Sequence, residues 1–322
     1  MNLILPICIG AICLLAIWSL VGWIIAISFL RKDHHHHNEV ETPRDRGITA
    51  KRLLIPCHVL DPNADHEVAA WMLIPDPDRA HDGACVVMVH GFDSGKDRVK
   101  TCEKDPGYRS CTLDQGAIAL RRAGFIVVAI DLRNHGESGD AGNVSLGARE
   151  AYDVLATVEY LSKNARQYGI NPSRIGLRGE SMGGAACLIA AAIDQNKRVA
   201  AVWSDSAFGT ASEAIADFIG FKGVPRIFVA PARFWFSRLT GIRLKDASPV
   251  EYVGQIECPV FLTHSSGDSV LPVYHLKTLS ESQEWQQQPE VWQLELYEHN
   301  RLWLDPDYQD RQIDFFKRRL AS

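Results

Sequence analysis

The sequence has no excess of basic residues and no internal repeat. Its 322 residues include 34 lysines and arginines against 39 aspartates and glutamates, a formal net charge of −5. A general nucleic-acid-binding protein usually carries a basic excess, so we expect no nucleic-acid partner. No period of about twenty to fifty residues recurs. Disorder is excluded as well, because 46% apolar and 23% charged residues is an ordinary globular composition.

Charged residues are also absent from the first part of the chain. Leu3 to Leu30 contain none and are dominated by Ile, Leu, Ala, Val and Trp. About 20 apolar residues suffice for a helix to cross a bilayer, so we predict one transmembrane helix, an anchor within residues 1–32. A cleaved signal peptide is the alternative. Against it, the run is long, no basic residue precedes it, and no convincing small-residue cleavage site follows.

The apolar run is followed by basic residues: Arg31, Lys32, Arg44, Arg46, Lys51 and Arg52. By the positive-inside rule, this places the C-terminal body in the cytoplasm. Two cysteines point the other way, since Cys102 and Cys111 could form a disulfide, which needs an oxidising compartment. We therefore expect a single-pass membrane protein, and we favour the cytoplasm as the location of its C-terminal body.

A polar linker, residues 33–50, contains the four adjacent histidines His34 to His37. No spaced Cys, Asp or Glu completes a metal site there, and such a tract is typically solvated. We therefore predict no metal.

Beyond the linker, apolar runs typical of strands alternate with runs of helical spacing. The expected strands are 51–59, 68–75, 84–89, 125–130, 174–178, 199–203, 258–264 and 291–298. The expected helices are 115–123, 146–168, 185–193, 275–282 and 308–320. This alternation indicates an α/β fold, a parallel sheet covered on both faces, with reactive groups at the C-terminal ends of the strands.

The strand ending at Arg178 leads into Gly179-Glu180-Ser181-Met182-Gly183-Gly184 and then into an alanine-rich helix. In a strand, tight turn and helix, G-x-S-x-G exposes the serine hydroxyl above the sheet. The plain alternative is a glycine-rich turn with an idle serine.

Further landmarks occur in order: His90-Gly91-Phe92 after one buried strand, Asp131 to Gly139 after the next, and Ser248 to Val260. With the Ser181 motif, they make the chain from about residue 51 to its end (51–322) resemble the α/β-hydrolase superfamily. The resemblance implies an eight-stranded, mostly parallel sheet with helices on both faces, and a nucleophile, acid and histidine in that order. It also implies a lid at residues 210–245.

Ser181 needs a base, and the candidate is His299, after the last strand; His264 and His275 are weaker candidates. The family often has glycines ahead of this histidine, and Tyr297-Glu298 are not glycines. Asp268 follows the seventh strand, as the family acid does, and Asp205 competes with it.

The resemblance places the oxyanion-stabilising N–H groups at Phe92 and Met182, and it gives His90 the task of holding the loop. Two further segments would shape the substrate site. Asp93 to Thr112 either rims the cleft or is a solvated loop, and we favour the loop. From Phe218 to Lys245 the lid has six basic residues, no acidic residue and several aromatics. It either touches anionic lipid and shelters an acyl chain, or only packs on the core.

The sequence thus predicts a membrane-anchored serine hydrolase that cleaves a carboxylic ester or thioester, with a small-molecule or lipid-like acyl substrate. This reaction implies no cofactor. An amidase or peptidase like the prolyl-oligopeptidase and serine aminopeptidase relatives is the alternative within enzymes. A non-catalytic α/β-hydrolase scaffold is the alternative outside them.

Overall fold

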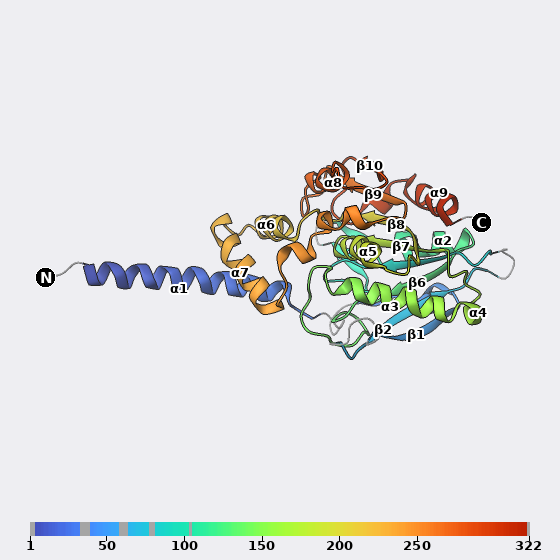
Figure 1. Cartoon of the computed structure of the whole chain (residues 1–322), viewed down its shortest axis with the longest axis horizontal. Coiled ribbons are helices and arrows are strands. Elements are labelled where there is room, and N and C mark those ends of the chain that lie inside the picture. The colour runs from blue at the N-terminus through green and yellow to red at the C-terminus, as the bar shows by residue number, and fades with distance from the viewer. Residues whose placement is uncertain (1–3, 33–38, 58–63, 77–80, 103–104, 321–322) are drawn as a thin grey trace.

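A long N-terminal helix, α1 (Ile4–Phe29), projects from an α/β body (Figure 1). The computed structural model of the chain describes residues 4–32, 39–57, 64–76, 81–102 and 105–320. The histidine tract His34 to His37 lies outside these residues. From Ile7 to Phe29 the helix is apolar and long enough to cross a membrane.

Eight strands form the central sheet, in the order β1-β2-β6-β3-β7-β8-β9-β10. They are β1 (Ala50–Pro56), β2 (Glu67–Leu73), β3 (Cys85–Val89), β6 (Ile126–Ile130), β7 (Ile175–Glu180), β8 (Val199–Asp205), β9 (Val260–Ser265) and β10 (Glu290–Leu294). β2 pairs antiparallel with β1 and β6, and the other neighbours pair in parallel. The predicted eight-stranded, mostly parallel sheet is therefore confirmed. Every residue of β3 and β6 is buried, as expected where helices cover both faces.

Two apolar cores lie on opposite faces of this sheet. The helices of the body are α2 (Ile118–Arg122), α3 (Glu150–Lys163), α4 (Ala165–Tyr168), α5 (Met182–Ile193), α8 (Tyr274–Ser280) and α9 (Tyr308–Leu320). α3 and α5 enclose one core, in which Val154 and Leu188 are buried. α2 and α9 enclose the other, around Trp203 and Phe315. The predicted helix 146–168 begins only at Glu150, because Leu146 has a φ of 54°.

The segment Asp93 to Thr112 is not the solvated loop that the sequence favoured. It contains a hairpin of β4 (Lys100–Cys102) and β5 (Asp105–Ser110). Lys96 is only 1% exposed, and its Nζ lies 2.9 Å from Asp131 Oδ2 and 2.7 Å from Glu137 Oε2. The positive charge of Lys96 is therefore paired with carboxylates of the body, and these ion pairs hold the segment Asp93 to Thr112 against the sheet. Cys111 is a free, buried thiol, and the side chain of Cys102 lies outside those described.

The lid segment, inserted between β8 and β9, contains α6 (Ala211–Phe221), η3 (Arg226–Phe228) and α7 (Val229–Thr240). α7 lies beside the C-terminal half of α1 (Figure 1). Ala26 and Phe29 of α1 are buried in one cluster with Ile215 and Phe236 of the lid. Single turns complete the chain: η1 (Pro43–Arg46), η2 (Leu113–Ala117), η4 (Leu244–Ala247), η5 (Pro249–Glu251), η6 (Val253–Gln255) and η7 (Leu302–Leu304).

Candidate active site

Ser181 stands at the turn between β7 and α5 in a strained backbone conformation, with φ 52° and ψ −120°. A non-glycine residue rarely adopts such a conformation without a reason in the surrounding structure. The turn also packs closely on the end of β3: a Cβ added to Gly183 would lie 2.4 Å from the carbonyl O of His90 and 2.5 Å from that of Val89. The glycine thus lets α5 begin directly over the sheet. The turn around Ser181 therefore has the geometry that the G-x-S-x-G motif predicts.

Three residues far apart in the sequence meet above this turn. His299 Nε2 lies 2.9 Å from Ser181 Oγ, and His299 Nδ1 lies 2.6 Å from Asp268 Oδ2. The carboxylate accepts from Nδ1–H, which leaves Nε2 to accept from the hydroxyl. The structure therefore brings together the residues proposed as nucleophile, base and acid, although no glycines precede His299.

Asp268 is held as an ionised acceptor. Its Oδ1 accepts from the backbone N–H groups of Val270 at 2.9 Å and Leu271 at 2.8 Å. His264 Nε2 lies 3.4 Å from Oδ2 and 2.7 Å from the carbonyl O of Leu271. Burial alone would raise the pKa of Asp268, but the charge of His299 and the hydrogen bonds from His264 and His299 outweigh it. The pKa therefore lies well below its ordinary value.

The competing groups lie elsewhere. Asp205 Oδ2 accepts from Tyr308 Oη at 2.6 Å, and Asp205 Oδ1 accepts from Ser206 Oγ at 2.7 Å. Both carboxylate oxygens of Asp205 are therefore bonded to groups other than the His299 imidazole. Burial raises the pKa of Asp205, against the charge of Arg178. His275 Nε2 lies 3.0 Å from Asp217 Oδ2, on the lid side.

The loop after β3 is positioned by His90, as the resemblance implied. His90 Nε2 accepts from the N–H of Leu132 at 3.0 Å, which leaves Nδ1–H to donate to the carbonyl O of Gly91 at 2.7 Å. Phe92 follows, and it lines the same cavity as Ser181 and Met182. The Met182 N–H is the first of α5 and has no intrahelical acceptor. These two N–H groups are the candidate oxyanion donors.

The residue before the serine was not singled out from the sequence. Glu180 is buried, and its carboxylate lies 2.9 Å from Lys100 Nζ of the hairpin and 3.5 Å from Arg178 Nη1. Burial would raise its pKa, but these two cations hold it below the ordinary value. Glu180 thus ties the segment Asp93 to Thr112 to the nucleophile turn. Its place inside the motif was the only signal for it in the sequence.

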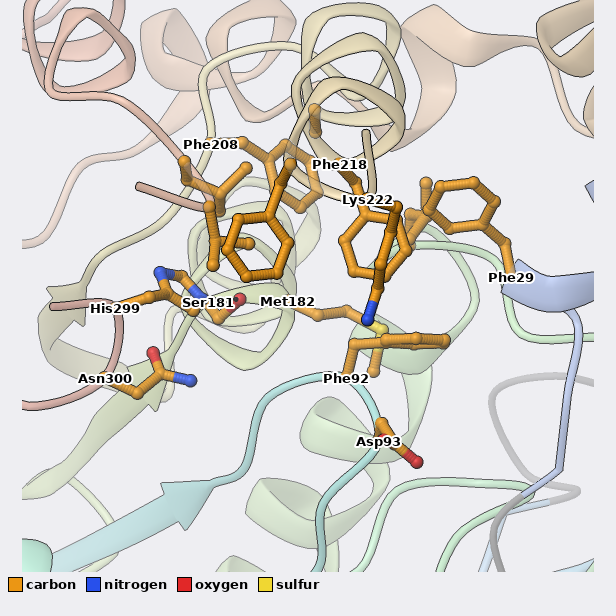
Figure 2. A pocket seen from close by; sticks show the side chains of 15 residues that line it. Phe29, Phe92, Asp93, Ser181, Met182, Phe208, Phe218, Lys222, His299 and Asn300 are labelled. Carbon is orange, nitrogen blue, oxygen red and sulfur yellow. Dashed lines mark hydrogen bonds between the residues drawn. The ribbon is translucent and has the colours of Figure 1, made fainter. Parts of the chain in front are cut away.

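A cavity of about 240 Å³ opens beside Ser181 (Figure 2). Its walls are mainly apolar and come from the body, the lid and the end of α1: Phe29, Phe92, Leu146, Met182, Phe208, Phe218, Phe221, Val270 and Leu271. The sequence analysis did not predict Phe29 as a wall residue, because an apolar residue in a long apolar helix carries no signal of a pocket.

Two clusters among the described residues have the composition of metal sites: Cys57, His66 and Asp153, and Glu41, Cys111 and Asp114. In the first, Arg133 Nη2 lies 2.7 Å from Asp153 Oδ1. In the second, the Arg46 guanidinium lies between Glu41 and Asp114. An arginine already neutralises the carboxylates in each case, so neither cluster fits a cation well.

Residues 74–282 match the BD-FAE family. The chain belongs to this family, and it is an esterase-like α/β-hydrolase, as the landmarks predicted. Among curated relatives, the Bacillus subtilis protein YqkD is 29% identical over 160 residues, 49% of this chain and 51% of that protein. Rat protein phosphatase methylesterase 1 is 30% identical over 161 residues, 48% of this chain and 40% of that protein. The alignment thus spans about half of either relative.

Two solved structures show the same fold. The Pyrococcus furiosus esterase Pf2001 superposes with a TM-score of 0.67 at 21% identity, over 90% of this chain and 99% of that one. The Pyrococcus horikoshii acylaminoacyl peptidase has a TM-score of 0.60 at 16% identity, over 85% of this chain and 42% of that one. Esterase and peptidase activities thus both occur on this fold.

Proposed function

We propose that the protein is a membrane-anchored serine hydrolase that cleaves a carboxylic ester or thioester through an acyl-enzyme. The observation that carries the proposal is the continuous hydrogen-bonded chain from Ser181 through His299 to Asp268, with distances of 2.9 and 2.6 Å. An ionised Asp268 stabilises the imidazolium that forms when His299 takes a proton.

The reaction follows from this geometry. Ser181 Oγ attacks the acyl carbon, and its proton passes to His299 Nε2. The negative charge that develops on the carbonyl oxygen is stabilised by the N–H groups of Phe92 and Met182. His299 then protonates the leaving alkoxide or thiolate as the carbon–heteroatom bond breaks, and the acyl group remains on Ser181. A water molecule, deprotonated by His299, then attacks the acyl carbon. The bond from that carbon to Ser181 Oγ breaks, His299 returns the proton to Oγ, and the acid is released.

A fluorophosphonate probe tests the nucleophile directly, because it reacts with an activated serine. We expect the wild-type protein to be labelled and Ser181→Ala to remain unlabelled, with Ser206→Ala as a control serine next to Asp205. Equal labelling of the wild type and Ser181→Ala would refute the proposal.

A second experiment compares the rates at which the protein hydrolyses acyl esters and aminoacyl amides, and it separates an esterase from the peptidase alternative. Faster cleavage of the amides would favour the peptidase.

We also propose that α1 is retained as the anchor. The helix packs on the lid, where Phe29 and Ala26 bury apolar surface against Ile215 and Phe236. Removal of α1 would expose that surface to water, at an unfavourable free energy. Arg31 and Lys32 favour a cytoplasmic body. Resistance of the full chain to carbonate extraction is the expected result, and a mature chain that lacks residues 1–32 would contradict retention.

A further inference from the structure

Helix α1 docks on the lid along its C-terminal half. Trp18 Nε1 donates to the carbonyl O of Ile227 at 2.7 Å, and Trp235 Nε1 donates to Ser19 Oγ at 3.0 Å. Further along, a Cβ added to Gly22 would lie 2.3 Å from Pro231 Cβ, so the two helices touch. The preceding large apolar side chains are 53–70% exposed: Ile7, Ile9, Ile12, Leu14, Leu15 and Ile17.

The part of α1 before this contact is too short to cross a bilayer alone. From Ile4 to Ile17 it measures about 21 Å at about 1.5 Å per residue. The hydrocarbon core of a bilayer is about 30 Å thick. A crossing therefore takes in about six further residues, as far as Trp23. Trp23 then lies at the boundary of the hydrocarbon, where tryptophan is enriched, and Trp18 lies about 7.5 Å inside it.

The lid residues at this level are apolar and face outward. Ile227, which is bonded to Trp18, is 65% exposed, and Phe234, next to Trp235, is 61% exposed. Basic residues lie near them along the chain: Arg226 precedes Ile227, Arg233 precedes Phe234, and Lys222 and Arg238 lie within the same lid segment. Exposed apolar side chains interspersed with basic residues, beside a membrane helix, are typical of a surface that enters the headgroup layer of a bilayer. We call Ile227 and Phe234 the lid tip, and we assign the bilayer as the partner into which the lid tip inserts.

The cavity beside Ser181 lies just beyond this headgroup layer. Phe29, the last residue of α1, lies about 9 Å beyond Trp23 along the helix. The headgroup layer is about 5–8 Å thick on each side. The Phe29 ring packs 5.0 Å from Phe218 and 6.3 Å from Phe92, centroid to centroid, and forms one wall of the cavity (Figure 2). The Phe29 wall of the cavity thus lies about 9 Å from the hydrocarbon boundary, near which lipid esters lie.

The size of the cavity also indicates a substrate that stays partly outside. At about 240 Å³ it is smaller than the roughly 300–1,000 Å³ of sites that enclose a drug-sized molecule. A lipid can insert its ester and part of one chain, while the rest remains in the bilayer.

One lysine of the lid points into this space, toward Phe92 and Met182 (Figure 2). Lys222 Nζ lies 5.3 Å from the Phe218 ring centroid. Within the described part of the chain it forms no ion pair, whereas Asp93, on the opposite wall, is paired with Arg98 at 3.1 Å. The Lys222 charge is therefore available to an anionic group of the substrate.

We propose that the substrate is an acyl ester of an anionic membrane lipid, which enters from the bilayer surface between the end of α1 and the lid. This inference rests on the proposed hydrolase function and adds the source and the charge of the substrate.

The test uses the full chain in phosphatidylcholine vesicles that contain a minor fraction of phosphatidylglycerol. Two rates are measured for each protein. One is the hydrolysis of the phosphatidylglycerol in these vesicles, and the other is the hydrolysis of the water-soluble ester p-nitrophenyl butyrate. For the double variant Ile227→Asp, Phe234→Asp we expect the phospholipid rate to fall about tenfold, because the lid tip no longer enters the bilayer. The soluble-ester rate should stay within about twofold, which also shows that the variant is folded.

The matched control is Val291→Asp, the same change at a 48% exposed residue of the edge strand β10. It should alter neither rate. Two outcomes would overturn this inference but not the proposed function. One is an equal rate of phospholipid hydrolysis in the lid variant and the wild type. The other is a wild type that cleaves the soluble ester but no phosphatidylglycerol. Failure to cleave either substrate, together with an unlabelled Ser181, would instead refute the proposed function and the inference with it.

The headgroup preference has its own variant. Lys222→Gln should lower the ratio of phosphatidylglycerol to phosphatidylcholine hydrolysis about fivefold, and Lys222→Arg should keep it. An unchanged ratio in Lys222→Gln would overturn the assignment of an anionic headgroup.

Discussion

The polar site around Ser181 and the wall of the cavity beside it are built in opposite ways. Around Ser181, polar groups are fixed in pairs: His299 to Asp268, Glu180 to Lys100, and His90 to the loop before Phe92. The cavity wall is mainly apolar, and α1 and the lid supply part of it as aromatic rings, such as Phe29 against Phe218. Directional bonds hold reacting atoms within fractions of an ångström, whereas aromatic surfaces adapt to the shape of a chain.

This difference separates the chemistry from the choice of substrate. The proposed reacting groups stand at the C-terminal ends of β7 and β9 and at the loop after β10, on the sheet itself. Much of the cavity wall comes from α1 and the lid, which are not part of the sheet. Substitutions in the first region should therefore abolish turnover or folding, while substitutions in the second should change which substrate is used.

The largest effect is expected from Asp268→Asn. Loss of the carboxylate leaves His299 in the wrong tautomer, and kcat should fall about 10⁴-fold, as in serine proteases with this substitution. Asp205→Asn, at the next strand end, is the matched control and should lower kcat by less than about tenfold. Steady-state kinetics on a soluble ester measures both. A comparable loss of kcat in a folded Asp205→Asn protein would show that the acid has been assigned to the wrong aspartate.

Gly183→Ala should destabilise the protein by about 1–3 kcal/mol, because the added methyl group meets the carbonyl O of His90. The measurement is urea unfolding of the detergent-solubilised chain, followed by tryptophan fluorescence. Gly220→Ala, in the lid helix α6, is the control, since a Cβ there meets nothing within 4 Å. Equal stability of the two variants would mean that the nucleophile turn is less tightly packed than described.

Phe29→Ala enlarges the cavity on its α1 side. We expect the ratio of kcat/KM for long-chain over short-chain p-nitrophenyl esters to rise about tenfold, with kcat on the short ester preserved. Phe125→Ala, a buried ring in the other core, is the control for loss of an aromatic side chain and should leave the ratio unchanged. A parallel fall of both rates in Phe29→Ala would place Phe29 with the catalytic centre instead.

The smallest effect concerns stability against pH. The folded-state pKa of Asp268 lies below its ordinary value of about 4. Its ionised form therefore stabilises the fold above about pH 4, and this contribution is lost as the pH falls through the lower, folded-state value. Between about pH 6 and pH 3, the free energy of unfolding should fall less steeply in Asp268→Asn than in the wild type.

Asp205→Asn should change that slope in the opposite direction, because burial raises the pKa of Asp205 and its charged form disfavours folding. Identical slopes in the two variants would contradict the difference between the two carboxylates.

Much of the sheet could be predicted, because fully buried strands such as Cys85–Val89 and Ile126–Ile130 appear as continuous apolar runs. The nucleophile turn could be located for a local reason as well: glycines beside Ser181 are needed wherever a strand turns tightly into a helix. The segment Asp93 to Thr112 could not, because its charges look solvated until their partners, Asp131 and Glu180, are brought next to them.

The sequence by itself determined the order of the strands along the chain, the turn around Ser181 and the apolar helix α1, since each depends on neighbouring residues. Only the tertiary structure decided that Asp268 rather than Asp205 faces His299, and that Phe29 forms a wall of the cavity beside Ser181. Both outcomes depend on distances between segments that are remote in the chain, and local periodicity carries no information about such distances.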